Sequence, residues 1–174
     1  MTRSNNVILS LDASTTSTGW AVFDKRGLAG YGVIKPDGDD WRDRLSHQGD
    51  KLKEVIEKFH PNRIVIEDVP LKNSNAKVLV VLGAVQGYIL GIASSYGVPM
   101  KFVLPSEWRS PLNLYDGTRD GTKRKELKKK SIEKANEIFG LNLVWKSPTS
   151  RFNEDDISDA ILLGYSQTVS KPKP

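Results

Sequence analysis

Two short apolar runs along the chain each end on a carboxylate. The first, Val7–Leu11, is followed directly by Asp12, and the second, Ile64–Ile66, is followed by Glu67. Continuous apolar runs of this length are typical of strands that are buried on both faces. An acid is poorly favoured inside a strand. The pattern therefore predicts two central strands, each with a carboxylate at the same kind of position.

A turn of small residues follows the first run. Residues 13–18, mostly hydroxyl-bearing, and Gly19 separate it from a second apolar run at 20–23. Small residues between two strands predict a tight hairpin whose backbone N–H groups can face a phosphate. A third strand over 28–35 would complete an antiparallel meander. The simpler alternative is a polar hairpin with a solvated Asp12.

Helical spacing of apolar residues follows the meander. Leu45 to Phe59 carries this spacing, and Pro61 ends it. A fifth strand is predicted over 98–104, and the segment 105–121 is interpreted as a loop because it is rich in Pro, Gly, Asp and Arg.

Residues 78–93 form the most apolar segment of the chain. The segment is shorter than a membrane span and contains Gln86, so it predicts a buried helix. Gly83, Gly87 and Gly91 lie four apart and form a stripe that permits close backbone approach. Tight packing of this stripe on the sheet is favoured over a dimer face.

The last third of the chain predicts two helices. The first runs from Thr122 to Gly140, with Gly140 as its C-terminal cap. Lys123, Arg124 and Lys125 fall in its first turn, where cations oppose the helix dipole, so either a bound phosphate or a solvated charged face accounts for them.

The second of these helices is predicted over 157–169. The acidic residues before it, Asn153 to Asp156, resemble a capping cluster, which explains Glu154 and Asp155 well. Asp156 and Asp159 are three apart and share one helix face.

Composition narrows the possible chemistry. The chain has 174 residues, no cysteine and two histidines, which favours one domain (1–169, with a short basic tail at 170–174) and oxygen ligands for any metal, such as magnesium or manganese. The net charge of +5 permits a polyanionic partner. The N-terminus lacks the apolar stretch of a signal peptide, so cytoplasmic residence without a membrane is expected.

Four acids now stand out: Asp12, Glu67, Asp156 and Asp159. Converging carboxylates repel one another unless cations lie between them. Two Mg²⁺ or Mn²⁺ ions would neutralise this charge and support in-line displacement at phosphorus. The order of strand-end Asp, strand-end Glu and D-x-x-D in a late helix is a stronger signal than any single acid.

Four stretches carry a family resemblance: I-L-S-L-D-A-S-T-T-S-T-G-W-A-V, I-V-I-E-D-V, L-G-A-V-Q-G and D-I-S-D-A-I-L-L. In this order they resemble the RuvC-type Holliday junction resolvases, and most closely their bacteriophage branch. The resemblance implies an α/β RNase H-like fold, with a five-stranded mixed sheet and helices on both faces. It also implies a homodimer that cuts two strands of a branched DNA such as a four-way junction, with Mg²⁺ or Mn²⁺ as cofactor.

Carried over position by position, the catalytic and metal-binding acids are Asp12, Glu67, Asp156 and Asp159. Asp155 competes for the third assignment, and Asp68 adds an acid beside Glu67. The candidate DNA-binding residues are Lys72, Arg109, Lys123, Arg124, Lys125, Lys128 and Lys129.

The sequence also departs from the family pattern. Ala13-Ser14 replaces the usual Pro-Gly, and Pro70-Leu71 stands where cellular members place an aromatic wedge. A weaker sequence preference and activity on several branch types are therefore expected. The rival interpretation is an ATPase domain, because D-A-S-T-T-S-T-G also resembles the phosphate loop of sugar kinases and actin-like proteins.

Overall fold

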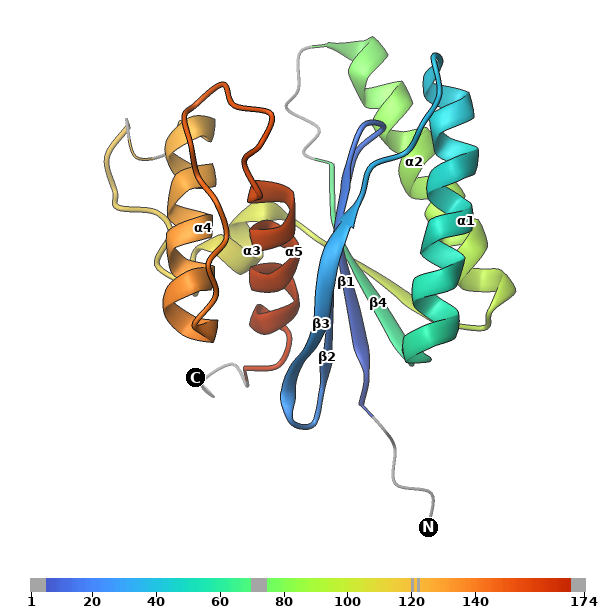
Figure 1. The fold of residues 1–174 in the computed structure, drawn as a ribbon, viewed down its shortest axis with the longest axis horizontal. Coiled ribbons are helices and arrows are strands. Elements are labelled where there is room, and N and C mark those ends of the chain that lie inside the picture. The colour runs from blue at the N-terminus through green and yellow to red at the C-terminus, as the bar shows by residue number, and fades with distance from the viewer. Residues whose placement is uncertain (1–5, 70–74, 120, 122, 170–174) are drawn as a thin grey trace.

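The predicted meander and the two further strands form one five-stranded mixed sheet in the computed structural model, which describes residues 6–69, 75–119, 121 and 123–169. The strand order is β3-β2-β1-β4-β5, with β1 antiparallel to β2 and parallel to β4 (Figure 1). The strands are β1 (Ile8–Ala13), β2 (Thr18–Asp24), β3 (Gly27–Ile34), β4 (Arg63–Glu67) and β5 (Met100–Val103).

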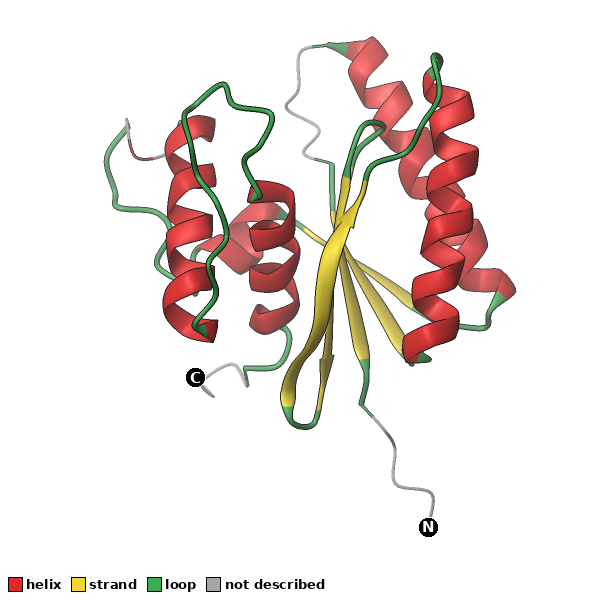
Figure 2. Ribbon diagram, in the orientation of Figure 1, coloured by secondary structure: helices red, strands yellow, loops and turns green. Residues whose placement is uncertain are grey.

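Helices cover both faces of this sheet, with α1 and α2 on one side and α3, α4 and α5 on the other (Figure 2). The helices are α1 (Trp41–Phe59), α2 (Ala76–Ser95), α3 (Pro105–Arg109), α4 (Arg124–Phe139) and α5 (Asp155–Ser166). The RNase H-like architecture is thus confirmed. The segment predicted as a loop contains α3. This helix has only about one turn, which is too short to produce a recognisable hydrophobic periodicity in the sequence.

Side-chain alternation along the central strands divides the core into two clusters. Ile8 and Val65 pack with α4 and α5, whereas Leu9, Ile64 and Ile66 pack with α1 and α2. Both clusters consist of fully buried residues, because successive side chains of a strand point to opposite faces. The continuous apolar runs therefore do belong to strands that are covered on both sides.

Close backbone contacts place α5 against the centre of the sheet. The Ser10 hydroxyl of β1 donates to the carbonyl of Ala160 at 2.7 Å. A Cβ on Gly19 would lie 1.8 Å from the backbone oxygen of Asp156, and one on Gly164 would lie 2.4 Å from Ser10 Oγ. Only glycine at these two positions permits the approach, so the packing itself sets where the acids of α5 lie.

The environment of α2 differs from the prediction. Only four of its twenty residues, namely Val85, Ile89, Ile92 and Ala93, are buried. A Cβ added at Gly83, Gly87 or Gly91 would meet nothing within 4 Å in the described part of the chain, so the glycine stripe faces outward rather than onto the sheet. The predictions of a buried helix and of glycine packing on the sheet were both wrong.

The length of α2 also exceeds the prediction. At 20 residues, α2 is the one helix in the described ranges that is long and apolar enough to cross a bilayer by length and composition. A core or interface helix meets the same criterion. The helix also connects two parallel strands of the sheet, β4 and β5, and lies beside α1.

Candidate active site

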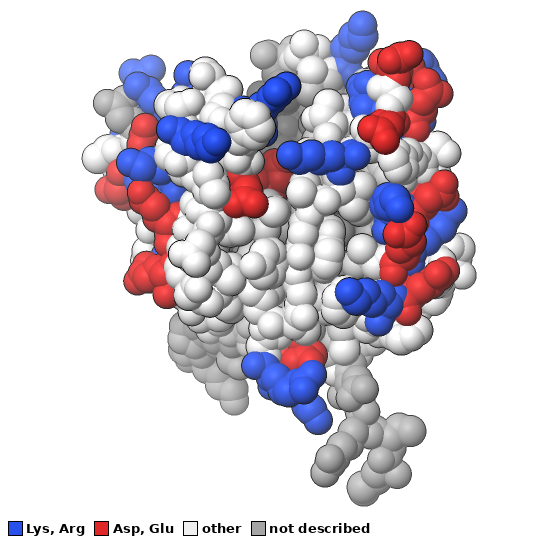
Figure 3. Space-filling view, in the orientation of Figure 1, with Lys and Arg blue, Asp and Glu red and all other residues white. Residues whose placement is uncertain are grey.

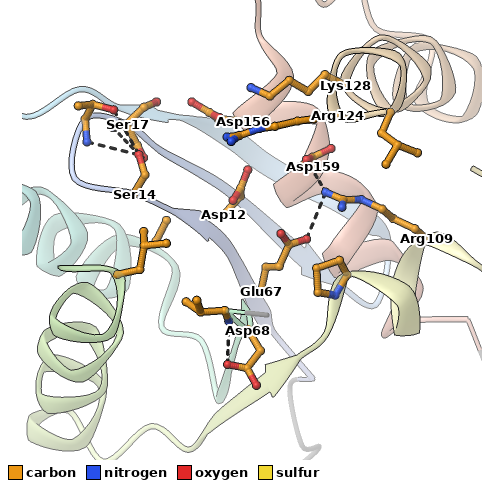
Figure 4. Close-up of a pocket in the computed structure, with 16 residues that line it drawn as sticks. Asp12, Ser14, Ser17, Glu67, Asp68, Arg109, Arg124, Lys128, Asp156 and Asp159 are labelled. Carbon is orange, nitrogen blue, oxygen red and sulfur yellow. Dashed lines mark hydrogen bonds and ion pairs between the residues drawn. The ribbon is translucent and has the colours of Figure 1, made fainter. Parts of the chain in front are cut away.

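A cleft of about 500 Å³ lies where the ends of β1 and β4 meet the start of α5. All four predicted acids line it, and Figure 4 shows their side chains directed toward one another. The lining also includes Ser14, Ser17, Asp68, Arg109, Arg124, Leu127 and Lys128. Residues far apart in the sequence thus form one acidic cluster, as the sequence predicts.

The strand register explains why the first two acids are neighbours. Leu11 of β1 pairs with Ile66 of β4, so the next residues along these parallel strands are Asp12 and Glu67. Three contacts fix Glu67. Its side chain accepts a hydrogen bond from Trp108 Nε1 at 2.7 Å, Arg109 lies beside the carboxylate, and its backbone carbonyl accepts one from Gln86 Nε2 at 3.0 Å.

The two acids of α5 reach the cleft because they lie one turn apart on the same helix face. Asp156 and Asp159 both line the cleft, whereas Asp155 does not. Asp155 is buried and pairs with Lys128 on α4. The structure thus distinguishes the two neighbouring acids that the sequence could not.

The predicted acidic cluster lies at the start of α5, with Glu154 at the N-cap and Asp155 in the first turn. Glu154 makes no side-chain capping bond; its carboxylate accepts the backbone N–H of Val144 at 2.7 Å. Asp155 is neutralised by Lys128. Both partners come from segments that are distant in sequence, so the acids mark the start of the helix but Glu154 does not cap it through its side chain.

Arg109 links two of the carboxylates. Its Nη2 lies 3.1 Å from Asp159 Oδ2 and 3.4 Å from Glu67 Oε2, and its guanidinium carbon lies 4.6 Å from the centre of the Trp108 ring. The side chain is only 15% exposed. A buried arginine in this position offsets part of the repulsion between the acids.

Burial and mutual repulsion disfavour the charged form of these carboxylates. Burial raises the pKa of Asp12 well above its ordinary value, and the charges of Asp159, Glu67 and Asp156 raise it further. Burial raises the pKa of Glu67 to about 7, although Arg109 opposes the change. Burial also raises the pKa of Asp159, again against the influence of Arg109. The folded protein therefore holds these carboxylates at a free-energy cost that a bound cation would relieve.

The donor set fits a divalent cation that prefers oxygen. Asp159 Oδ1 is buried and has no hydrogen-bond partner within the described residues, so it is available as a ligand. In the same ranges, no group of three or more His, Cys, Asp or Glu side chains is arranged to hold a metal ion. Arg109 bridges Glu67 and Asp159, so this ion pair must loosen before both could share a cation.

The predicted DNA-binding residues separate into two groups, apart from Lys72, which lies outside the described residues. Arg109, Arg124 and Lys128 line the cleft. Lys123, Lys125 and Lys129 are exposed on or beside α4 and do not line it. Two further positions of the prediction, Pro70 and Leu71, also lie outside the described residues. The basic helix thus presents its first turns beside the acids.

The acid next to Glu67 points elsewhere. The Asp68 side chain accepts the backbone N–H of Val69 at 2.8 Å, and Figure 4 shows it directed away from the other four acids. Alternation along an extended segment sends consecutive side chains in opposite directions. Asp68 therefore borders the cleft without joining the cluster.

The β1–β2 turn is closed by its own hydrogen bonds. Ser14 Oγ accepts the backbone N–H groups of Thr16 and Ser17, and the Ser14 N–H donates to the Ser17 carbonyl at 3.0 Å. These three donors are therefore not available to a phosphate. The turn thus offers fewer backbone donors to a phosphate than expected, which weakens the phosphate-loop interpretation.

Sequence reasoning missed two residues that position Glu67. Trp108 is fully buried, and Gln86 reaches the end of β4 from α2. A tryptophan directly before Arg109 was the available signal, because a buried indole N–H needs an acceptor. Gln86 was noted only as a polar interruption of an apolar segment.

The chain is similar to proteins of one known family. Residues 8–113 match the family described as crossover junction endodeoxyribonuclease RuvC. A protein of that name from Rickettsia conorii is 25% identical over 170 residues, which covers 95% of this chain and 98% of the relative. The protein of that name from Ruegeria pomeroyi is 30% identical over 103 residues, which covers 57% of this chain and 62% of the relative.

A solved structure shares the fold. The structure of T. thermophilus RuvC in complex with Holliday junction substrate superposes with a TM-score of 0.69 and 16% identity, and the match covers 93% of this chain and 92% of that one. The shared fold includes the mixed sheet and the helices on both faces.

Proposed function

The chain belongs to the RuvC family of crossover junction endodeoxyribonucleases, and we propose that it cleaves Holliday junctions and other branched DNA by metal-dependent phosphodiester hydrolysis. One observation carries the proposal: four carboxylates from β1, β4 and α5 line a single cleft that basic residues border. This arrangement favours the nuclease over the ATPase domain, since acids rather than turn amides face the ligand.

Asp12, Glu67, Asp156 and Asp159 are the proposed catalytic residues, and their oxygens would hold two Mg²⁺ or Mn²⁺ ions. When bound, such a pair lowers the pKa of the attacking water and stabilises charge on the leaving oxygen. Trp108 orients the Glu67 carboxylate, and the packing of α5 fixes Asp156 and Asp159. Arg109, on release from Glu67 and Asp159, would contact the phosphate.

Asp156 rather than Asp155 is the proposed third acid, because Asp155 is already neutralised by Lys128. Carboxylates that a lysine has neutralised are poor ligands for a second cation. Since the substrate is DNA in a bacterial or phage-infected cell, the proposed location is the cytoplasm. The preference for branch type remains a prediction: four-way junctions, three-way junctions and forks are all expected substrates.

The central test is incubation with end-labelled four-way, three-way, fork and linear duplex DNA, with and without Mg²⁺. Paired cleavage of the branched substrates in Mg²⁺, with linear duplex left intact, is the expected result. Equal cleavage of linear and branched DNA, or no metal dependence, would contradict the proposal.

Contacts from α4 to the DNA backbone predict a reduced salt dependence in a charge-neutralised variant. Replacing Arg124 and Lys125 by glutamine is expected to weaken binding to every sequence and to lower the log–log salt slope by about 0.9 for each lost duplex phosphate contact. Lys128 is left intact because its removal would leave Asp155 buried without a partner. Fluorescence anisotropy between 50 and 300 mM salt measures the slope.

A matched control uses two lysines of α1, Lys51 and Lys53, which are exposed and paired only with neighbours on their own helix. Their replacement by glutamine should leave the slope unchanged. If the α4 variant also kept the wild-type slope, the basic run would be a solvated helix face.

A homodimer is the proposed assembly, because two symmetric nicks are most simply made by two copies of one site. The exposed face of α2 supports this interface. Val80 is 70% exposed, Leu90 is 44% exposed, and the outward glycine stripe would let a second helix approach.

Replacing Gly87 by leucine is therefore expected to convert a dimer to a monomer and to replace paired nicks with single ones. A Cβ at this position meets nothing within 4 Å in the described part of the chain, so the fold of the monomer should survive. Sedimentation velocity and a nicking assay on a cruciform plasmid measure the two effects. Glu54→Leu, on the exposed surface of α1, is the control. A wild-type protein that sediments as a monomer with and without DNA would contradict the dimer.

A further inference from the structure

A second cleft of about 550 Å³ adjoins the acidic one. The two share Thr16, Ser17 and Asp156, so they meet at the β1–β2 turn and the start of α5. The far side of the second cleft is formed by Lys35, beyond β3, and by the loop before α5, which includes Phe152. A strand whose phosphate lies at the acids would therefore continue past this loop.

Phe152 is presented to solvent by a well-held loop. Its side chain is 56% exposed, more than any other aromatic residue in the described ranges. Asn153 fixes the loop, since its Oδ1 accepts the N–H of Lys146 at 2.8 Å and its Nδ2 donates to the carbonyl of Ser147 at 2.7 Å. These bonds from Asn153 hold the loop in a conformation that leaves the Phe152 ring in solvent. An exposed apolar ring is unfavourable in the free protein, and packing among the described residues does not account for it.

Cations surround this ring. Lys146 Nζ lies 4.7 Å and the Arg151 guanidinium carbon 5.1 Å from its centre. Neither of these side chains nor Lys35 forms an ion pair with an acid among residues 6–69, 75–119, 121 and 123–169. In Figure 3, Lys and Arg side chains border a small group of acids on the upper half of the face. Both cations, Lys146 and Arg151, lie over the ring and have no acid partner in these ranges, so a nucleobase that stacks on the ring would displace a cation toward its flanking phosphates.

We propose that Phe152 stacks on an unpaired nucleobase beside the scissile phosphate, with Lys35, Lys146 and Arg151 contacting the neighbouring phosphates. This inference rests on the proposed nuclease function and deepens it. Bases in a continuous duplex are already stacked on each other, whereas a branch point offers free base faces. The ring therefore contributes selectivity for branched DNA, because a branch point offers it a free base face and a continuous duplex does not.

The test compares Phe152→Ala, Phe152→Leu and Phe152→Trp with the wild type in EDTA, where no cleavage occurs. Stacking on an aromatic ring is worth roughly 1–3 kcal/mol per base, so the alanine variant should lose about 5- to 150-fold in affinity for a four-way junction. Duplex affinity should change little. The leucine variant should lose nearly as much, whereas tryptophan should retain binding. A junction carrying 2-aminopurine at the branch should show quenched fluorescence with wild type but not with alanine.

Tyr31→Ala is the matched control, because Tyr31 is 42% exposed on β3 and lines neither cleft. It should leave affinity and fluorescence unchanged. The salt slope should be unchanged in Phe152→Ala and lower in Arg151→Gln. Wild-type junction affinity in Phe152→Ala, or full retention of binding by leucine, would overturn the inference. A wild type that cuts no branched DNA would instead contradict the proposed function.

Discussion

Asp12→Asn is expected to abolish strand cleavage while leaving DNA binding intact or stronger. Asp12 lies at the centre of the charge cluster, since Asp159, Glu67 and Asp156 all raise its pKa after burial does. The amide cannot supply the negative charge that a divalent ion requires. Loss of several kcal/mol of transition-state stabilisation corresponds to at least about a thousandfold in rate. Single-turnover cleavage of a labelled four-way junction measures the rate, and anisotropy measures the affinity.

The comparison of Asp155 with Asp156 sharpens this prediction. Asp156→Asn should lose cleavage as Asp12→Asn does, because it lines the acid cleft. Asp155→Asn should keep measurable cleavage and instead lower stability, because its partner Lys128 loses a buried counter-charge. Asp50→Asn, on the exposed surface of α1, serves as the neutral control. Cleavage at the wild-type rate by Asp12→Asn would show that the chemistry lies elsewhere.

The central strands and their acids were predictable because a buried strand leaves a continuous apolar run, and parallel neighbours end at the same edge. The D-x-x-D spacing likewise placed Asp156 and Asp159 on one face. These features depend on local periodicity alone. The resemblance to a known family then connected the two ends of the chain.

What the sequence could not predict depends on contacts between distant segments. Because α2 is apolar on all sides, its sequence does not indicate which face packs on the sheet. The outward direction of Gly87 could therefore not be predicted. Glu154 and Asp155 are residue types that favour the start of a helix, but their carboxylates bind the Val144 N–H and the Lys128 side chain instead of the helix backbone. Trp108 acquires its role only when α3 approaches Glu67.

Without metal, the protein is expected to lose stability as pH rises from about 4.5 to 7. A carboxyl whose pKa is raised by folding binds a proton in the folded state that the unfolded chain has already released, so stability falls with pH in this window. For Glu67, the difference between 4.5 and about 7 corresponds to about 3 kcal/mol. Burial raises the pKa of Asp12 and Asp159 in the same direction.

Thermal unfolding in EDTA measures this effect, and roughly 5–10 °C should separate pH 5 from pH 8 for a chain of this size. Mg²⁺ or Mn²⁺ should recover most of that loss at pH 8 and little at pH 5, because protons and cations compete for the same oxygens. Asp12→Asn should unfold at a higher temperature than wild type in EDTA at pH 8 and should respond less to either ion. A melting temperature that rises from pH 5 to pH 8 in EDTA, or that ignores both ions at pH 8, would mean that these carboxylates do not form a cation site.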